Sequence, residues 1–322
     1  MSDLYQHWSI DPFVYLMAIV IAIHLRGLRA RLAAINRAGR PSWPWIQQAA
    51  LFYCGVLILL VAITSPVDYW AQRYLTLHVV QHLLLSFFAP PLIVLGAPWL
   101  PLLRGLPKPL RRALGVVLQC TRSAAPSRSP RSGRTRPGAA ITAAAATRVR
   151  RLAGSPITSV ALFNASMVFW HLPGPFDLAE RNSSVHIWLE HSSFFLFGLA
   201  LWLQVFGSYP LRPVLDGPRR IAALIGTNAV MVLVAMTLVM FTRAAYPAYA
   251  AFHPLAERAA DQQIAGALLW VCGEVTFLPA ILYTVSRWLD GAANGAAPST
   301  TGAHTPVPNP APPKSARKLF IH

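Results

Sequence analysis

The chain has 322 residues, of which 55% are hydrophobic and 12% are charged, and it carries a formal net charge of +17. With a mean hydropathy of +0.45, this composition excludes a soluble globular domain and predicts an integral membrane protein. We expect no nucleic-acid partner, because topology signals and attraction to the lipid bilayer account for the basic excess.

Seven apolar runs have approximately the length at which a helix of about 20 residues crosses the hydrocarbon core of a bilayer. They lie near residues 10–25, 45–63, 75–96, 156–172, 186–206, 221–241 and 263–288. The first run is not preceded by a basic segment, so we expect a retained helix and not a cleaved signal peptide. The sequence therefore predicts an all-α fold: a polytopic membrane protein of about seven transmembrane helices in one domain, residues 1–290.

The basic residues predict the orientation of these helices. Of the 28 Lys and Arg residues, 24 lie in alternate connections along the chain: residues 26–40, 97–155, 207–220, and the segment from Arg287 onward. By the positive-inside rule these connections are cytoplasmic, which places the N-terminus outside and the C-terminus in the cytoplasm.

Two segments of the predicted cytoplasmic side have little apolar surface with which to form a core. Residues 121–151 are rich in Ser, Pro, Arg and Ala, and residues 291–322 are rich in Ala, Pro and Thr. We expect the first to be a disordered basic cytoplasmic loop and the second a disordered cytoplasmic tail.

Histidines are concentrated on the predicted outer face, which holds seven of the ten in the chain. His78 and His82 open the third apolar run and are four residues apart, so they share one face of a helix. Met167 and His171 repeat this spacing at the end of the fourth run.

The fifth apolar run opens with the segment "HIWLEH". Within it, His186 and Glu190 again have the four-residue spacing that places two side chains on one helix face. His191 follows His186 by five residues and would point roughly 140° away from it on an α-helix, so we expect it to face a different neighbour.

Each of these side chains alone has a simpler interpretation as an interface anchor or a packing residue. Together they indicate a site, because ionisable groups inside a membrane are costly and usually face a functional interior. Imidazole ligands favour Cu, Zn, Fe or Ni, a thioether favours Cu(I), and copper has the highest affinity in the divalent series. None of the three cysteines falls in an outer segment. We therefore predict a copper site without thiolates, formed by His78, His82, His171, His186, His191 and Met167.

Sequence patterns of common enzymes are missing from the chain. It contains no HExxH or GxSxG motif and no glycine-rich loop of the kind that binds phosphates. We therefore expect a protein that is not an enzyme.

Four blocks of the sequence form a recognisable series: "TSPVDYWAQRYLTLHVVQHLLLSFFAPPLIVLGAP", "FNASMVFWHLPGPFDLA", "HIWLEHSSFFLFGLALW" and "DQQIAGALLW". In this order they resemble the CtaG-type cytochrome c oxidase assembly proteins. The resemblance covers residues 45–290, and the chain departs from the family pattern in the long insertion after the third apolar run.

The resemblance implies a seven-helix protein of the bacterial cytoplasmic (inner) membrane that is needed for a functional haem-copper oxidase. Its role would concern the copper centres, with oxidase subunits or other assembly factors as partners. The resemblance also implies functional residues at His78, His82, Trp170, His171, His186, Glu190, His191, Asp261 and Gln262. We expect Glu190, Asp261, Gln262 and Trp170 to support the metal ligands, with Glu190 or Asp261 accepting a hydrogen bond from an imidazole N–H.

Two further function classes remain open at this stage. A membrane b-type cytochrome would bind haem through two histidines, but one that spans the bilayer needs axial ligands at two depths, and only His24 lies near the inner side. We therefore expect no haem. A metal or small-molecule transporter would need polar groups through the whole span, for which Cys272 and Glu274 are the only indication.

Overall fold

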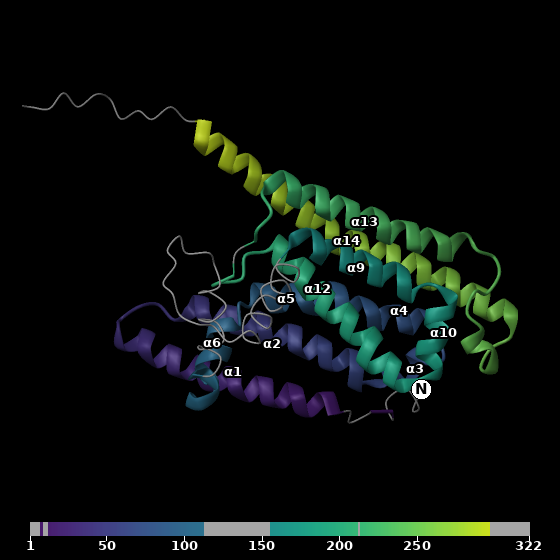
Figure 1. Cartoon of the computed structure of the whole chain (residues 1–322), viewed down its shortest axis with the longest axis horizontal. Coiled ribbons are helices and arrows are strands. Elements are labelled where there is room, and N and C mark those ends of the chain that lie inside the picture. Colours follow the sequence, from purple (N-terminus) through teal and green to yellow (C-terminus); the bar gives the residue numbers. More distant parts are fainter. Residues whose placement is uncertain (1–6, 9–11, 113–154, 212, 297–322) are drawn as a thin grey trace, which may run out of the picture.

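The computed structural model describes residues 7, 8, 12–112, 155–211 and 213–296 (Figure 1). Every regular element in this part of the chain is a helix, which agrees with the predicted all-α fold. The loop predicted at 121–151 lies outside the described residues, as does the tail from residue 297 onward. The last helix continues to Ala296 and so occupies the first part of the segment predicted as a disordered tail.

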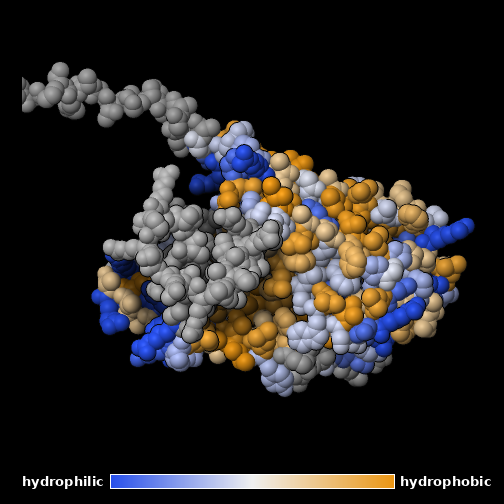
Figure 2. Space-filling view, viewed as in Figure 1, coloured by the Kyte–Doolittle hydropathy of each residue, from blue (hydrophilic) through white to orange (hydrophobic). Residues whose placement is uncertain are grey.

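Five helical segments are long and apolar enough to cross a membrane. They are α1 (Pro12–Arg37), α2 (Trp43–Thr64), the run Leu75–Leu95, α13 (Gly217–Met240) and α14 (Leu255–Ala296). Apolar residues cover much of the visible surface, whereas hydrophilic residues gather toward its two ends (Figure 2). This distribution is that of a membrane-embedded bundle.

Two of the seven predicted spans coincide with shorter helices. The span predicted at 156–172 corresponds to α9 (Pro156–Trp170), which has only 15 residues. The span predicted at 186–206 is divided among α11 (Ser183–Val185), the π-helix η3 (His186–His191) and α12 (Ser192–Val205). The number of seven spans and their orientation therefore stay predictions.

The connections lie alternately at two ends of the bundle (Figure 1). One end, called here the α10 end, carries α3 (Pro66–Ala71), α10 (Pro173–Arg181) and the 3-10 turn η4 (Pro247–Ala251). The opposite end carries α6 (Trp99–Gly105), which packs against α1. All three of these α10-end elements lie in connections that the sequence predicts to be outside.

Helix starts follow a simple local rule in this chain. Ser65, Ser155 and Asp216 each precede a helix with a proline in its first two positions, and each side chain accepts a hydrogen bond from a backbone N–H of the first turn. Such caps satisfy N–H groups that have no partner within the helix, and proline needs none. The spans predicted from apolar length near 156 and 221 begin at Pro156 and Gly217, whereas the one predicted from 263 begins earlier, at Leu255.

The run Leu75–Leu95 is the centre of the bundle. Of its most apolar stretch, 67% is buried inside the bundle, whereas this share is 17 to 39% in the other four long apolar helices. It consists of α4 (Leu75–Leu83), the π-helix η2 (Leu84–Phe88) and α5 (Ala89–Leu95). Its neighbours are α2, α3, α12 and α14, so side chains on α4 point into the interior.

A close contact between η2 and α12 positions the segment that precedes α12. A Cβ atom on Gly198 would lie 3.0 Å from the backbone oxygen of Ser86, so a larger residue would have to move the two segments slightly apart. The Trp202 indole Nε1 donates a hydrogen bond of 3.1 Å to the same oxygen. The contact fixes α12 on the central run and thereby brings η3 against α4.

Candidate metal centre

A buried cluster of imidazoles and carboxylates lies at the α10 end of the bundle. It comprises His78 and His82 from α4, Glu180 from α10, and His186, Glu190 and His191 from η3. Each of these six side chains is at most 6% exposed. Buried ionisable groups at this density are costly unless they pair with one another or bind an ion.

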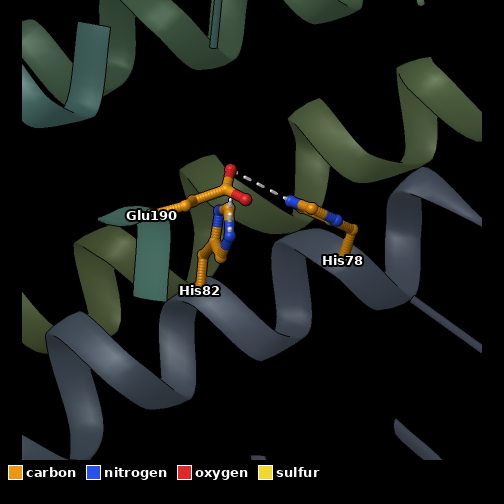
Figure 3. Close-up of side chains that lie close together, drawn as sticks. All are labelled: His78, His82 and Glu190. Atoms are coloured by element: carbon orange, nitrogen blue, oxygen red, sulfur yellow. Dashed lines mark ion pairs between the residues drawn. The ribbon is translucent and has the colours of Figure 1, made fainter. Parts of the chain in front are cut away.

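Glu190 connects η3 with α4. Its Oε1 lies 3.5 Å from Nε2 of His78 and 3.5 Å from Nε2 of His82, as Figure 3 shows. Its Oε2 lies 2.8 Å from Nδ1 of His186. The predicted His78–His82 pair on one helix face is confirmed, with ring centroids 4.2 Å apart.

Glu180 contacts the opposite side of His78 and is the residue that the sequence analysis missed. Its Oε1 lies 3.0 Å from Nδ1 of His78 and 3.7 Å from Nδ1 of His186. In the sequence it belongs to a connection between spans, where a glutamate is normally solvated. The sequence offers one indication that Glu180 faces the interior: it follows Phe176 by four residues and so shares its helix face. The Phe176 ring packs on His78, with centroids 4.8 Å apart.

The prediction that His191 faces away from His186 is wrong. Residues 186–191 form a π-helical turn, in which hydrogen bonds join residues five apart, so that the sixth residue lies roughly above the first. The rings of His186 and His191 are consequently 4.1 Å apart, and His191 also lies 5.9 Å from the ring of His82. Periodicity could not reveal this, because the expected angle assumes an α-helix.

His171 and Met167 lie at the edge of the cluster. The His171 ring is 6.3 Å from that of His82, and its Nδ1 is 2.7 Å from the backbone oxygen of Met167. The Met167 side chain packs in the hydrophobic core. Its contact with His171 thus involves the backbone, and a thioether ligand stays a prediction.

Two of the residues predicted to support the ligands, Trp170 and Gln262, bind a neighbouring hydroxyl or the backbone. Trp170 Nε1 donates to Ser193 Oγ at 2.8 Å, and this hydroxyl in turn donates to the Glu190 backbone oxygen at 2.8 Å. Gln262 accepts a hydrogen bond from the Ala245 N–H at 2.8 Å and so holds the connection after α13.

Asp261 has a different role from the predicted one. Its two carboxylate oxygens accept hydrogen bonds from the backbone N–H of Leu75 at 2.6 Å and of Thr76 at 3.3 Å. Tyr74, the residue before α4, offers no side-chain cap, so a carboxylate from α14 caps α4 in its place. Asp261 therefore sets where α4 begins and does not hydrogen-bond an imidazole.

Several polar atoms of the cluster have no hydrogen-bond partner among the described residues. They are both ring nitrogens of His78 and of His82, Oε1 of Glu180 and of Glu190, and Nε2 of His186 and of His191. A buried polar atom left unsatisfied costs about 1–3 kcal/mol, and a bound ion is one of the explanations for such atoms.

Two groups of three ligand atoms have the spacing that a metal ion requires. His78, His82 and Glu190 form one, and His78, Glu180 and His186 form the other, with the atoms of each group within 4.8 Å of one another. Imidazole nitrogen with carboxylate oxygen is a donor set suited to zinc, copper or iron. The residues therefore fit a transition-metal ion.

Aromatic rings enclose the cluster and a cavity adjoins it. Phe176 packs on His78, and Phe194 packs on His82 with centroids 4.2 Å apart. His191 lines a cavity of about 300 Å³, formed mostly by apolar side chains of α1, α2 and the η3–α12 segment. Aromatic rings thus cover His78 and His82, and the cavity lies beside His191.

Comparison with known proteins places the chain among its relatives. The model of the family described as cytochrome c oxidase caa3 assembly factor matches residues 22–291. Uncharacterized proteins of Mycobacterium bovis and Mycobacterium tuberculosis are each 26% identical over 287 residues, and one of Mycobacterium leprae is 24% identical over 290 residues. Each alignment covers 87% of this chain and 39% of the relative, so the chain spans about two fifths of the length of these curated relatives. No solved structure matches the chain.

Proposed function

Because the chain belongs to the cytochrome c oxidase caa3 assembly factor family, we propose that it serves the assembly of a haem-copper oxidase by holding copper at the buried histidine–glutamate cluster. Copper would be cargo, received and released, and the protein would act as a binding protein and not as an enzyme. The observation that supports this most directly is the set of buried nitrogen and oxygen atoms of His78, His82 and Glu190 that lack hydrogen-bond partners.

The three residues would bind the ion through His78 Nε2, His82 Nε2 and Glu190 Oε1, the atoms that converge in Figure 3. Neutral imidazoles are good ligands for copper, which has the highest affinity of the divalent first-row series. The glutamate contributes negative charge, which offsets the cost of placing a cation in a buried site.

Delivery requires a route out of the cluster. His191 lies 5.9 Å from His82 between ring centroids and also lines the cavity of about 300 Å³ between α1, α2 and α12. The cavity would give the cluster a way to the surface of the bundle, where an oxidase subunit or another assembly factor would receive the ion. By the predicted orientation, this exchange takes place near the outer face of the bacterial cytoplasmic membrane.

The geometry favours an ion over haem. A bis-histidine haem needs two histidines on facing helices, with the porphyrin plane between them. His78 and His82 lie on one helix with ring centroids 4.2 Å apart, and Glu190 Oε1 lies 3.5 Å from Nε2 of each, so this pair suits one ion and not the two faces of a haem. For the transporter alternative, Glu274 on α14 accepts a hydrogen bond of 3.0 Å from Asn228 on α13, which gives this carboxylate a structural role.

The test is oxidase activity in cells that express the chain as their only copy. The double variant His78→Ala and His82→Ala should abolish oxidase activity while the amount of the chain in the membrane stays unchanged. His253→Gln is the matched control, because His253 lies at the same end of the bundle but pairs with Glu257 at 3.4 Å, outside the cluster. Normal oxidase activity in the double variant would reduce the cluster to a structural role.

A further inference from the structure

We propose that the cluster holds two metal ions bridged by His78, with Glu180 and His186 completing the second position. The inference rests on the proposed metal binding at the cluster. It adds a ligand, Glu180, that lies outside the spans and was not expected from the sequence.

The two ring nitrogens of His78 face different ligand groups. Nε2 lies 3.5 Å from Oε1 of Glu190, next to Nε2 of His82. Nδ1 lies 3.0 Å from Oε1 of Glu180, which is itself 3.7 Å from Nδ1 of His186. That nitrogen also lies 2.8 Å from Oε2 of Glu190, a contact that an ion in the second position would replace. Both nitrogens of an imidazole can bind metal, so one ring can serve two ions on opposite edges.

The charges of the cluster point to the same conclusion. Glu180 and Glu190 are two buried carboxylates, and within the described part of the chain all their ion pairs are with histidines. If the imidazoles are neutral, the cluster carries two uncompensated negative charges, which are costly in a buried site. Because the two carboxylates lie on opposite edges of His78, a cation beside each would place positive charge next to both.

A simpler role for Glu180 would be to orient His78 by accepting a hydrogen bond from its Nδ1–H, as carboxylates often do behind a metal ligand. The contact between the two atoms is 3.0 Å, yet neither atom has a partner in hydrogen-bonding geometry. The contact is close enough for either role, and the second acid-histidine group, with Nδ1 of His186 3.7 Å from the same oxygen, favours two ligands that share an ion.

The second ion changes the protonation of His78. With one ion bound, the ring is neutral, and its other nitrogen carries a proton. A second ion would take the place of that proton, which would leave to solvent, so that the ring would become an imidazolate between two cations. The imidazolate and the two carboxylates would then place three negative charges beside the two ions.

The test is the copper content and the electron paramagnetic resonance signal of the purified full chain, loaded with Cu(II) alone and dialysed. The wild-type chain should retain two copper ions, and its signal per copper should be reduced because an imidazolate bridge couples the two spins. Glu180→Gln keeps an acceptor for His78 but removes the charged ligand, and it should retain one copper with a full, uncoupled signal.

Glu257→Gln is the matched control, because Glu257 also pairs with a histidine, His253 at 3.4 Å, but is exposed. It should retain two coupled copper ions. One copper in both the wild type and Glu180→Gln would overturn the second position and leave the proposed function intact, with Glu180 an orienting group. Two uncoupled ions in the wild type would also overturn the inference. No copper in the wild type would overturn both, and His78 would then be the centre of an ion-pair network between Glu180 and Glu190.

Discussion

Asp261 is expected to stabilise the fold by capping α4 rather than to bind or support metal. In Asp261→Ala, the backbone N–H groups of Leu75 and Thr76 lose acceptors at 2.6 and 3.3 Å. Loss of a helix cap costs about 0.5–2 kcal/mol, and the charged acceptor places this site near the upper limit. We therefore expect a loss of about 2 kcal/mol in the free energy of unfolding, or roughly a thirtyfold change in the folding equilibrium.

The assay is reversible denaturation of the purified chain in mixed micelles, followed by helix content. Asp261→Asn should lose less than Asp261→Ala, because its amide oxygen can still accept one hydrogen bond. Asp290→Ala on the same helix is the control, since Asp290 is exposed at the far end of α14 and should change stability by less than about 0.5 kcal/mol. Both Asp261 variants should keep the copper content of the wild type. Loss of copper without loss of stability in Asp261→Ala would refute the capping role.

Four further predictions follow from the site and the bundle. A reporter fused after His253 should be periplasmic and one fused within 121–151 cytoplasmic, because 24 of the 28 basic residues lie on one predicted side; finding both on the same side would contradict the orientation. Copper affinity, measured by competition with a chelator, should fall as the pH is lowered, because protons compete for imidazoles that must be neutral to bind; affinity independent of pH would argue against histidine ligands. Met167→Leu should weaken Cu(I) more than Cu(II), since a thioether is the softer ligand; equal effects would remove Met167 from the site. Gly198→Leu should lower stability by about 1–3 kcal/mol and weaken copper binding, because a Cβ at this position already lies 3.0 Å from the Ser86 oxygen and η3 would shift; unchanged melting and copper content would show that this contact does not position η3.

The sequence predicts well what depends on local pattern. The run Leu75–Leu95 and the His78–His82 pair follow from apolar length and four-residue spacing, and the structure has both. The His186–Glu190 pair has the same spacing and forms a contact of 2.8 Å. These features need no knowledge of which helices are neighbours.

Other features depend on tertiary contacts and could not be predicted. His191 joins the cluster because residues 186–191 form a π-helical turn, which apolar periodicity does not specify. Glu180 joins it because α10 folds back over α4, whereas its sequence reads as an ordinary connection. Asp261 caps a helix whose first residue lies 186 positions earlier in the chain, so its partner is set by the packing of α14 against α4.

The most direct test of metal binding is an absorption spectrum combined with metal analysis of the chain purified from copper-supplied cells. We predict bound copper, no Soret band, and loss of the copper in the double variant His78→Ala and His82→Ala. A Soret band that disappears in the same variant would instead identify a haem site, and a chain with neither copper nor haem would contradict the proposal that the cluster binds metal.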